Sequence, residues 1–341
     1  MYGRADRLLH HVALGLRPLL DATFDLERAR WGKAVRDVPV ERPVFVTGLA
    51  RAGTSILTRI LHESGGFACA SYRDLPFPLA PNSWARLGGK RRVEARERGH
   101  GDGLMHDLDS PEAIEEVFWR LREGARYRRA DGLAPVAPQQ ESITAFRDYV
   151  RLVLHAHGGG RYLSKNNNNA LRLAALIEAF PDAVLVHPFR DPLQQALSLR
   201  AQHVRACTLA GEDPFRRRFM TWLGHHEFGA DQRPFLFDGA PGPDEDRGHV
   251  DYWLKLWISV HEALLFPPHE VHGRQLFVDY DALCANPRRY APRLGARIGA
   301  PVALETLASP PVRAADVSPA LLARAAETHV CLTDRFDAAL G

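Results

Sequence analysis

The residues best suited to chemistry in this sequence form a glycine-bounded segment, Gly48-Leu-Ala-Arg-Ala-Gly-Thr-Ser55. Glycines allow a tight turn in which consecutive backbone N–H groups point into one concavity, and a following helix N-terminus adds partial positive charge. An arginine adds full charge and several donors, and threonine and serine add hydroxyl donors. The segment therefore predicts a cradle for an anion such as a phosphate. The residues expected to contact this anion are Arg51, Ala52, Gly53, Thr54 and Ser55.

The spacing of this loop also fits the nucleotide triphosphatase pattern G-x-x-x-x-G-K-[ST], but Thr54 stands where that pattern has lysine. The departure argues against Mg-ATP chemistry and leaves a cradle whose cation, Arg51, precedes the second glycine. A glycine turn that merely joins a strand to a helix is the alternative interpretation. The arginine and the two hydroxyl side chains favour the cradle.

A second candidate phosphate site follows the apolar run 184–189, where Arg190 is succeeded by Asp191 and Pro192. An Asp-Pro pair often does no more than start a helix. Ser198 lies two helical turns further along, so it returns to the helix face that begins near Pro192. An arginine at a strand end and a serine on the next helix can bind one phosphate together.

The elements that position these residues can be predicted from hydrophobic periodicity and from helix start signals. Strands are expected at 43–47, 161–164, 183–188 and 275–278, and helices at 53–64, 111–129, 141–157, 169–180, 192–206 and 249–265. Strands that alternate with helices predict an α/β fold, here a P-loop-type, mostly parallel sheet flanked by helices. We expect one domain over 1–341, with an N-terminal helical segment at 1–40 and two substrate-side insertions at 66–110 and 208–248.

Composition limits the classes of function. The chain has 341 residues, of which 45% are hydrophobic and 25% charged, as in ordinary soluble proteins. A net charge of +3 gives no indication of a nucleic-acid partner. The four cysteines are scattered without metal-ligand spacing, which favours a reducing compartment, and we expect the cytoplasm. The apolar run 8–20 is too short and too polar for a transmembrane segment and predicts an amphipathic packing or surface helix, with a membrane-surface role as the alternative.

The loop 48–55, Arg190-Asp-Pro and Ser198 together resemble the P-loop sulfotransferases that use 3′-phosphoadenosine 5′-phosphosulfate (PAPS). Further segments resemble that family in the same order along the chain. They are Tyr162-Leu-Ser-Lys-Asn, Phe180-Pro-Asp-Ala, and the run from Leu276 through Tyr280-Asp-Ala-Leu to Pro287. The resemblance covers about 43–65 and 160–300.

This resemblance implies roles for individual residues. Residues 51–55 would hold the 5′-phosphosulfate, Arg190 and Ser198 the 3′-phosphate, and Lys165 would contact the bridge to the sulfate. Lys165 is one of only four lysines, which favours this role over a solvated lysine that closes a strand. PAPS is the expected co-substrate and PAP the product, and cations of the protein would act in place of a metal.

The general base is a separate question. In the cytosolic branch of the family a histidine stands two residues after the lysine, but this chain has Asn167, whose amide is not basic. Other branches use a carboxylate soon after the phosphosulfate helix, and Asp74 matches that place. The alternative is that Asp74 pairs with Arg73 or caps a turn. His106 and His225 are the next candidates, so the expected catalytic set is Lys165, Arg51 and Asp74.

The sequence thus predicts an enzyme, a sulfotransferase that moves a sulfuryl group from PAPS to an acceptor hydroxyl or amine. The alternatives are a P-loop small-molecule kinase and a catalytically inactive nucleotide-binding homologue. Thr54 argues against the kinase, and Asn167 keeps the inactive homologue open. No motif identifies the acceptor or the oligomeric state.

Overall fold

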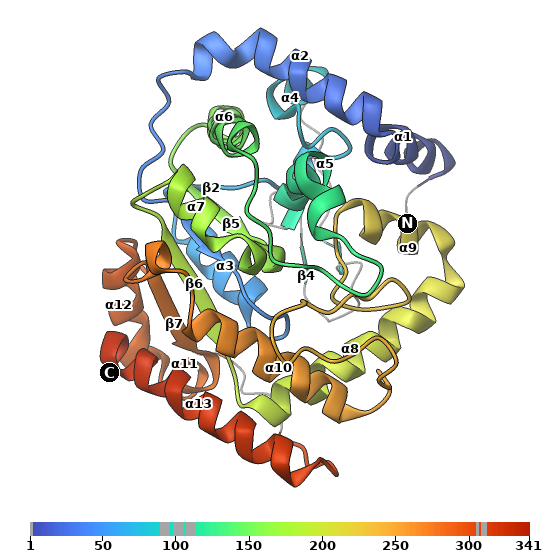
Figure 1. Cartoon of the computed structure of the whole chain (residues 1–341). Coiled ribbons are helices and arrows are strands. Elements are labelled where there is room, and N and C mark those ends of the chain that lie inside the picture. The colour runs from blue at the N-terminus through green and yellow to red at the C-terminus, as the bar shows by residue number, and fades with distance from the viewer. Residues whose placement is uncertain (1–2, 89–95, 98–104, 107–112, 305–306, 308–311) are drawn as a thin grey trace.

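The computed structural model describes residues 3–88, 96–97, 105–106, 113–304, 307 and 312–341, and its centre is a sheet of five parallel strands (Figure 1). The strands lie in the order β2-β5-β1-β6-β7. Their bounds are β1 Val44–Val46, β2 Phe67–Ala68, β5 Arg161–Lys165, β6 Val184–Phe189 and β7 Gln275–Asp279. A separate antiparallel pair consists of β3 (Arg96–Glu97) and β4 (Met105–His106). The prediction of an α/β fold with a mostly parallel sheet flanked by helices is confirmed.

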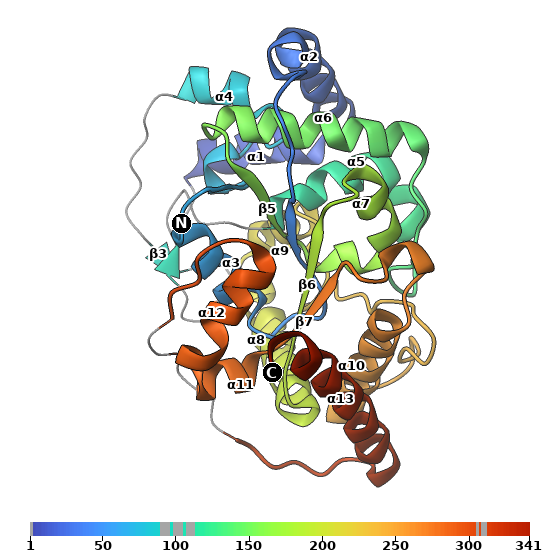
Figure 2. The same cartoon turned by 90° about the vertical axis from the view of Figure 1, so that its left-hand side faces the viewer.

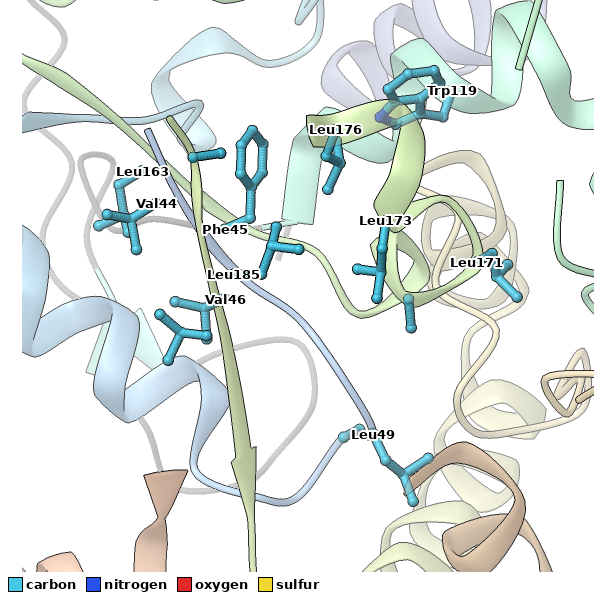
Figure 3. Packing of buried hydrophobic residues seen from close by; sticks show 14 of the residues in the cluster. Val44, Phe45, Val46, Leu49, Trp119, Leu163, Leu171, Leu173, Leu176 and Leu185 are labelled. Carbon is cyan, nitrogen blue, oxygen red and sulfur yellow. The ribbon is translucent and has the colours of Figure 1, made fainter. Parts of the chain in front are cut away.

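Strand β1 lies in the middle of the sheet. Every residue in it is apolar, as expected for a parallel strand that is covered on both faces. Successive side chains of a strand point to opposite faces. Figure 3 shows Phe45 on the side of Leu176, and Val44 and Val46 on the opposite side, towards α3 (Thr54–Glu63). All three β1 side chains have no exposed surface. The central strand is therefore rigidly held, and so is the point at which the loop after it begins.

Helices cover both faces of the sheet. On the face of Phe45 lie α6 (Gln140–Ala156) and α7 (Leu173–Ala179), and Phe45 contacts Phe146 of α6. Figure 2 shows α6 between α2 (Arg17–Val35) and the strands. The other helices are α4 Pro81–Gly88, α5 Glu116–Tyr127, α8 Pro192–Glu212, α9 Pro214–Trp222, α10 Val250–Leu265, α11 Tyr280–Ala285, α12 Pro287–Ile298 and α13 Pro319–Leu340. Short 3₁₀ turns occupy 72–74, 113–115, 167–171 and 269–271.

The N-terminal segment forms two helices, α1 (Arg4–Gly15) and α2, instead of the single helix expected over 8–20. They separate at Leu16, which is extended, and Pro18 stands in the first turn of α2, where a missing N–H costs nothing. Arg7 of α1 donates two hydrogen bonds to the carboxylate of Asp213, the residue before α9. These are packing helices, and no helix of the described residues has the length and apolar character needed to cross a membrane.

The two expected insertions differ in how much of each the structure describes. Most of 66–110 lies outside the described residues. The segment 208–248 begins inside α8, which continues to Glu212, and contains α9, whose first turn is capped by the Asp213 side chain. Helix α8 is thus longer than the sequence pattern predicts, and it carries the chain away from the sheet edge before α9 turns back.

A buried polar network joins α5 to the segment that follows β5. The guanidinium of Arg172 donates two hydrogen bonds to Glu116, at 3.0 and 3.1 Å. The neighbouring Glu115 accepts hydrogen bonds from Tyr162 of β5 at 2.8 Å and from Asn169 at 2.8 Å. Because buried charges are costly unless paired and hydrogen-bonded, this network must form as a unit. It fixes the 3₁₀ turn immediately after the end of β5.

We expect Arg172→Met to lower the free energy of unfolding by about 3–5 kcal/mol, because it leaves buried carboxylates without their cation. The Arg172 side chain is 0% exposed. Arg324→Met is the matched control, since Arg324 pairs with Glu262 but is 52% exposed, and such a pair contributes about 0–1 kcal/mol. Urea unfolding followed by circular dichroism measures both. Equal losses in the two variants would contradict the structural role of the network.

Three histidines are almost fully enclosed in the protein and donate Nδ1–H to a backbone carbonyl. His187 on β6 donates to Thr47, His226 to Asp231, and His261 on α10 to Trp257. Burial lowers the pKa of His187 to about 4 and that of His226 to about 4, against the opposing effect of these hydrogen bonds. Burial likewise lowers the pKa of His261 to about 3. All three are therefore neutral in the folded chain at neutral pH.

We expect acid to destabilise the fold as pH falls from about 6.5 towards 4. The unfolded chain then binds protons that the folded chain cannot, so stability falls by about 1.4 kcal/mol per pH unit for each such histidine. Above the pKa that histidine has in the unfolded chain, none of this stability is lost. Unfolding in urea across this range measures the slope, and His261→Gln should make it shallower. A free energy of unfolding that stays level over this range would refute the expectation.

Candidate functional site

The predicted site residues lie at the carboxyl ends of neighbouring parallel strands. β1 is followed by the loop 47–53, β5 ends at Lys165, and β6 is followed by Arg190. β1 lies between β5 and β6. After β1, the chain first forms the half of the sheet that contains β2 and β5, and then the half that contains β6 and β7. In open parallel sheets the crevice at such a reversal of strand order is where ligands bind. The fold thus gathers the candidate residues at one edge.

The loop after β1 has a backbone that requires glycine at residue 53. Gly53 has φ of 82°, and a Cβ there would lie 2.2 Å from the ring of Tyr280. Arg51 also has a positive φ, 67°, a conformation that side chains rarely adopt. The loop is therefore held against the start of α11 in a strained shape. Such strain occurs where surrounding packing determines the backbone.

The first turn of α3 completes the cradle. The cap residue, Gly53, offers no side chain to its N–H groups. Ala52 and Thr54 are buried, and the Thr54 carbonyl accepts the hydroxyl of Thr58 at 2.7 Å. Ser55 is half-buried in the same turn. Unpaired N–H groups at a helix start, backed by its dipole, are suited to an anion.

Arg51 and Ser198 belong to two different predicted phosphate sites, and they meet. The Arg51 Nε donates a hydrogen bond to the Ser198 Oγ at 3.0 Å. Ser198 lies on α8, so this bond ties the loop after β1 to the helix after β6. The two predicted sites are therefore adjacent, as a ligand with two phosphate groups would need.

Arg190 is held by a carboxylate that the sequence analysis did not single out. Its Nε donates to the Asp281 Oδ1 at 3.0 Å, and the other Asp281 oxygen accepts the backbone N–H of Asp191 at 2.9 Å. Asp191 in turn caps α8 through the N–H of Gln194. Arg190 is only 7% exposed. Its direction is thus set by α11 and by the cap of α8 together.

Lys165 ends β5 beside a second ionisable cluster. Asn167, two residues on, donates its Nδ2 to the Glu227 Oε1 at 2.9 Å. The other Glu227 oxygen lies 3.5 Å from the His225 Nδ1. Burial alone would raise the pKa of Glu227, but the hydrogen bond and charge of His225 and the charge of Lys165 outweigh it and lower that pKa well below its usual range. Glu227 is therefore an ionised carboxylate close to Lys165.

Asp74 lies in the 3₁₀ turn at 72–74, and its carboxylate has two partners. It accepts the backbone N–H of Ser71 at 2.8 Å and contacts the His157 Nε2 at 3.0 Å. His157 lies before the first residue of β5, whereas Lys165 is the last residue of that strand. The two ends of this five-residue strand are about 13 Å apart, at 3.3 Å per residue. The turn-capping alternative for Asp74 is thus seen in the structure, and its role as general base stays a prediction.

His106 and His225 are the alternatives to Asp74 as the general base. The side chain of His106 lies outside the described residues. His225 is buried and contacts Glu227. Within the described ranges, no three His, Cys, Asp or Glu side chains are grouped so as to hold a metal ion.

The site contains residues that sequence reasoning missed. Asp281 follows Tyr280 in the segment whose family resemblance was noted, so that segment was a usable signal. Glu227 follows two histidines, His225 and His226, and no motif of the sequence singles out this carboxylate. Only the fold brings Glu227 to Asn167, which is 60 residues away in the sequence.

Comparison with known proteins adds independent information. A profile of the sulfotransferase family matches residues 43–232. Among solved structures, sulfotransferase STF1 of Mycobacterium tuberculosis H37Rv is 15% identical over 94% of this chain and 83% of its own, with a TM-score of 0.46. Sulfotransferase STF9 of Mycobacterium avium is 17% identical over 88% and 71%, with a TM-score of 0.43. No curated protein matches the sequence.

The family match extends over more than half of the chain. It contains the loop after β1, Lys165 at the end of β5, and Arg190 and Ser198 after β6, as well as Glu227. The chain belongs to the sulfotransferase family.

Proposed function

We propose that this protein transfers a sulfuryl group from PAPS to a hydroxyl or amine of an acceptor. The observation that carries the proposal is the hydrogen bond between Arg51 and Ser198, since it joins a cradle for one phosphate to a site for another. PAPS has phosphate groups at its 5′ and 3′ positions and requires such a paired site.

The residues present fit this donor. We assign the 5′-phosphosulfate to residues 51–55, where the helix start and Arg51 offer donors. We assign the 3′-phosphate to Arg190, which follows the end of β6, and to Ser198 on α8. A phosphate there would compete with Asp281 for Arg190 and with Arg51 for Ser198, and charge-assisted bonds to a phosphate are the stronger ones.

The cations are suited to the transfer step. Negative charge grows on the oxygen that leaves with PAP, and fixed positive groups stabilise it. Lys165 is in register with Val46 at the end of β1, and Arg51 follows on the loop from the same strand. We propose that these two side chains offset the charge of the leaving oxygen, which in kinases is the task of magnesium.

Two broader proposals accompany this function. One apolar core continues from Leu14 in α1 to Leu340 in α13, which supports a single domain over 1–341. None of the four described cysteines forms a disulfide, in keeping with a reducing compartment, and we propose the cytoplasm.

We expect PAP to bind more tightly than AMP, because only PAP has the 3′-phosphate that Arg190 and Ser198 would bind. Each charge-assisted bond contributes about 1.5–3 kcal/mol, so the affinities should differ by one or more powers of ten. Arg190→Ala should remove most of this difference by weakening PAP alone. Calorimetric titration measures it, with Arg200→Ala on the exposed face of α8 as control. Equal affinities in the unaltered protein would refute the proposed function.

We expect Lys165→Ala and Arg51→Ala each to lower the rate of PAP formation from PAPS by about 10²–10³, as removal of one charge-stabilising donor does elsewhere. PAP affinity should change little in Lys165→Ala, since PAP lacks the sulfate. The control is Lys255→Ala, because Lys255 pairs with Glu245 outside the crevice. Rapid-quench assays with saturating PAPS and acceptor measure the rate. A normal rate of PAP formation in either variant would exclude that residue from the transfer step.

A further inference from the structure

A hollow open to solvent lies between α8, α9 and residues 225–231. Apolar side chains form most of its wall: Ala206, Leu209, Ala210, Met220 and Phe228. Polar side chains also line it: Gln202, Arg216, Thr221, and the pair of Arg217 and Asp231, which are 2.7 Å apart. Concave, mostly apolar hollows with a few polar groups are typical of sites for small molecules.

Glu227 connects this hollow with the end of β5. It lines the hollow together with His225. Its Oε1 accepts the amide of Asn167, which follows the strand that ends in Lys165, and the charge of Lys165 acts on it. A small molecule in the hollow would therefore have one polar end beside Glu227, close to the proposed path of the sulfuryl group.

The carboxylate of Glu227 is oriented by its neighbours and still has lone-pair sites at which it can accept a hydrogen bond. Asn167 donates to one oxygen at 2.9 Å, and His225 lies 3.5 Å from the other. An ionised carboxylate has about four lone-pair sites, so these two contacts leave room for an acceptor hydroxyl. Asn167 and His225 are thus positioning residues for Glu227.

We propose that the hollow is the acceptor site, that it takes a small uncharged alcohol with an apolar body, and that Glu227 accepts the proton of its hydroxyl. This inference rests on the proposed function. The acceptor oxygen forms a bond to sulfur, and the bond between sulfur and the bridging phosphate oxygen breaks. That oxygen leaves with PAP and keeps the electron pair, and the acceptor proton passes to a Glu227 oxygen and then to solvent.

Glu227 and Asp74 make competing assignments for the general base. Asp74 contacts Ser71 and His157 beside the segment that enters β5. Glu227 accepts a hydrogen bond from Asn167, near the end of β5 at which Lys165 lies. The proton acceptor must lie within hydrogen-bond reach of the attacking hydroxyl, and only Glu227 also lines the hollow.

The test is Glu227→Gln, which keeps the shape of the side chain and the bond from Asn167 but removes the base. With PAPS and 2-phenylethanol we expect the rate to fall by about 10² or more. With 4-nitrophenol at mildly alkaline pH, which is largely ionised without help, the loss should be much smaller. The control Glu245→Gln should keep the 2-phenylethanol rate. Glu227→Gln as active as the unaltered protein, or equally impaired with both acceptors, would overturn the proposal.

Ala206→Phe tests the hollow itself without changing any polar group. Because the new ring would fill the space beside α8, KM for 2-phenylethanol should rise about tenfold or more while PAP affinity stays the same. An unchanged KM, or transfer by the unaltered protein to glucose but not to 2-phenylethanol, would overturn the acceptor assignment. PAP titration keeps the two proposals distinct. If PAP binds and Glu227→Gln is active, this inference alone fails, and if PAP does not bind, the proposed function fails.

Discussion

The contact between Gly53 and the ring of Tyr280 holds the crevice together. An added Cβ at residue 53 would lie 2.2 Å from that ring, so the loop after β1 can follow its path only with glycine there. Tyr280 starts α11 directly after β7, and the adjacent Asp281 holds Arg190 at the end of β6. The ends of β1, β6 and β7 are thus fixed relative to one another. Arg51 extends the same unit to α8 through Ser198.

Each of the three cations at the sheet edge is matched by an acceptor of the protein. Arg51 donates to Ser198, Arg190 pairs with Asp281, and the charge of Lys165 is balanced by Glu227 nearby. Without such partners, partly buried positive groups so close together would repel one another and would be costly to remove from water. An anionic donor can bind by exchanging these internal contacts for stronger ones with its own phosphate groups. The same pairing keeps Glu227 ionised.

The sheet, the glycine loop and the positions of Arg190 and Ser198 could be predicted because they depend on local patterns: apolar runs, turn residues and helix spacing. Glu227 could not, because its meeting with Asn167 depends on how α9 returns to the sheet edge. The run of asparagines at 166–169 is only partly explained by local capping. The fold adds a further explanation, since Asn166 and Asn169 donate to buried glutamates of the α5 region. Asp74 has both features, because its place in the sequence predicts a general base and its contacts also cap a turn.

The central claim is that one crevice binds both phosphate groups of a 3′-phosphorylated adenine nucleotide. A crystal structure of the protein with PAP tests it most directly. We expect the 5′-phosphate at the start of α3 and the 3′-phosphate within hydrogen-bond distance of Arg190 and Ser198, with the bond between Arg51 and Ser198 broken or lengthened from its 3.0 Å. PAP bound elsewhere, or with its 3′-phosphate in solvent and Arg190 still paired to Asp281, would contradict the account.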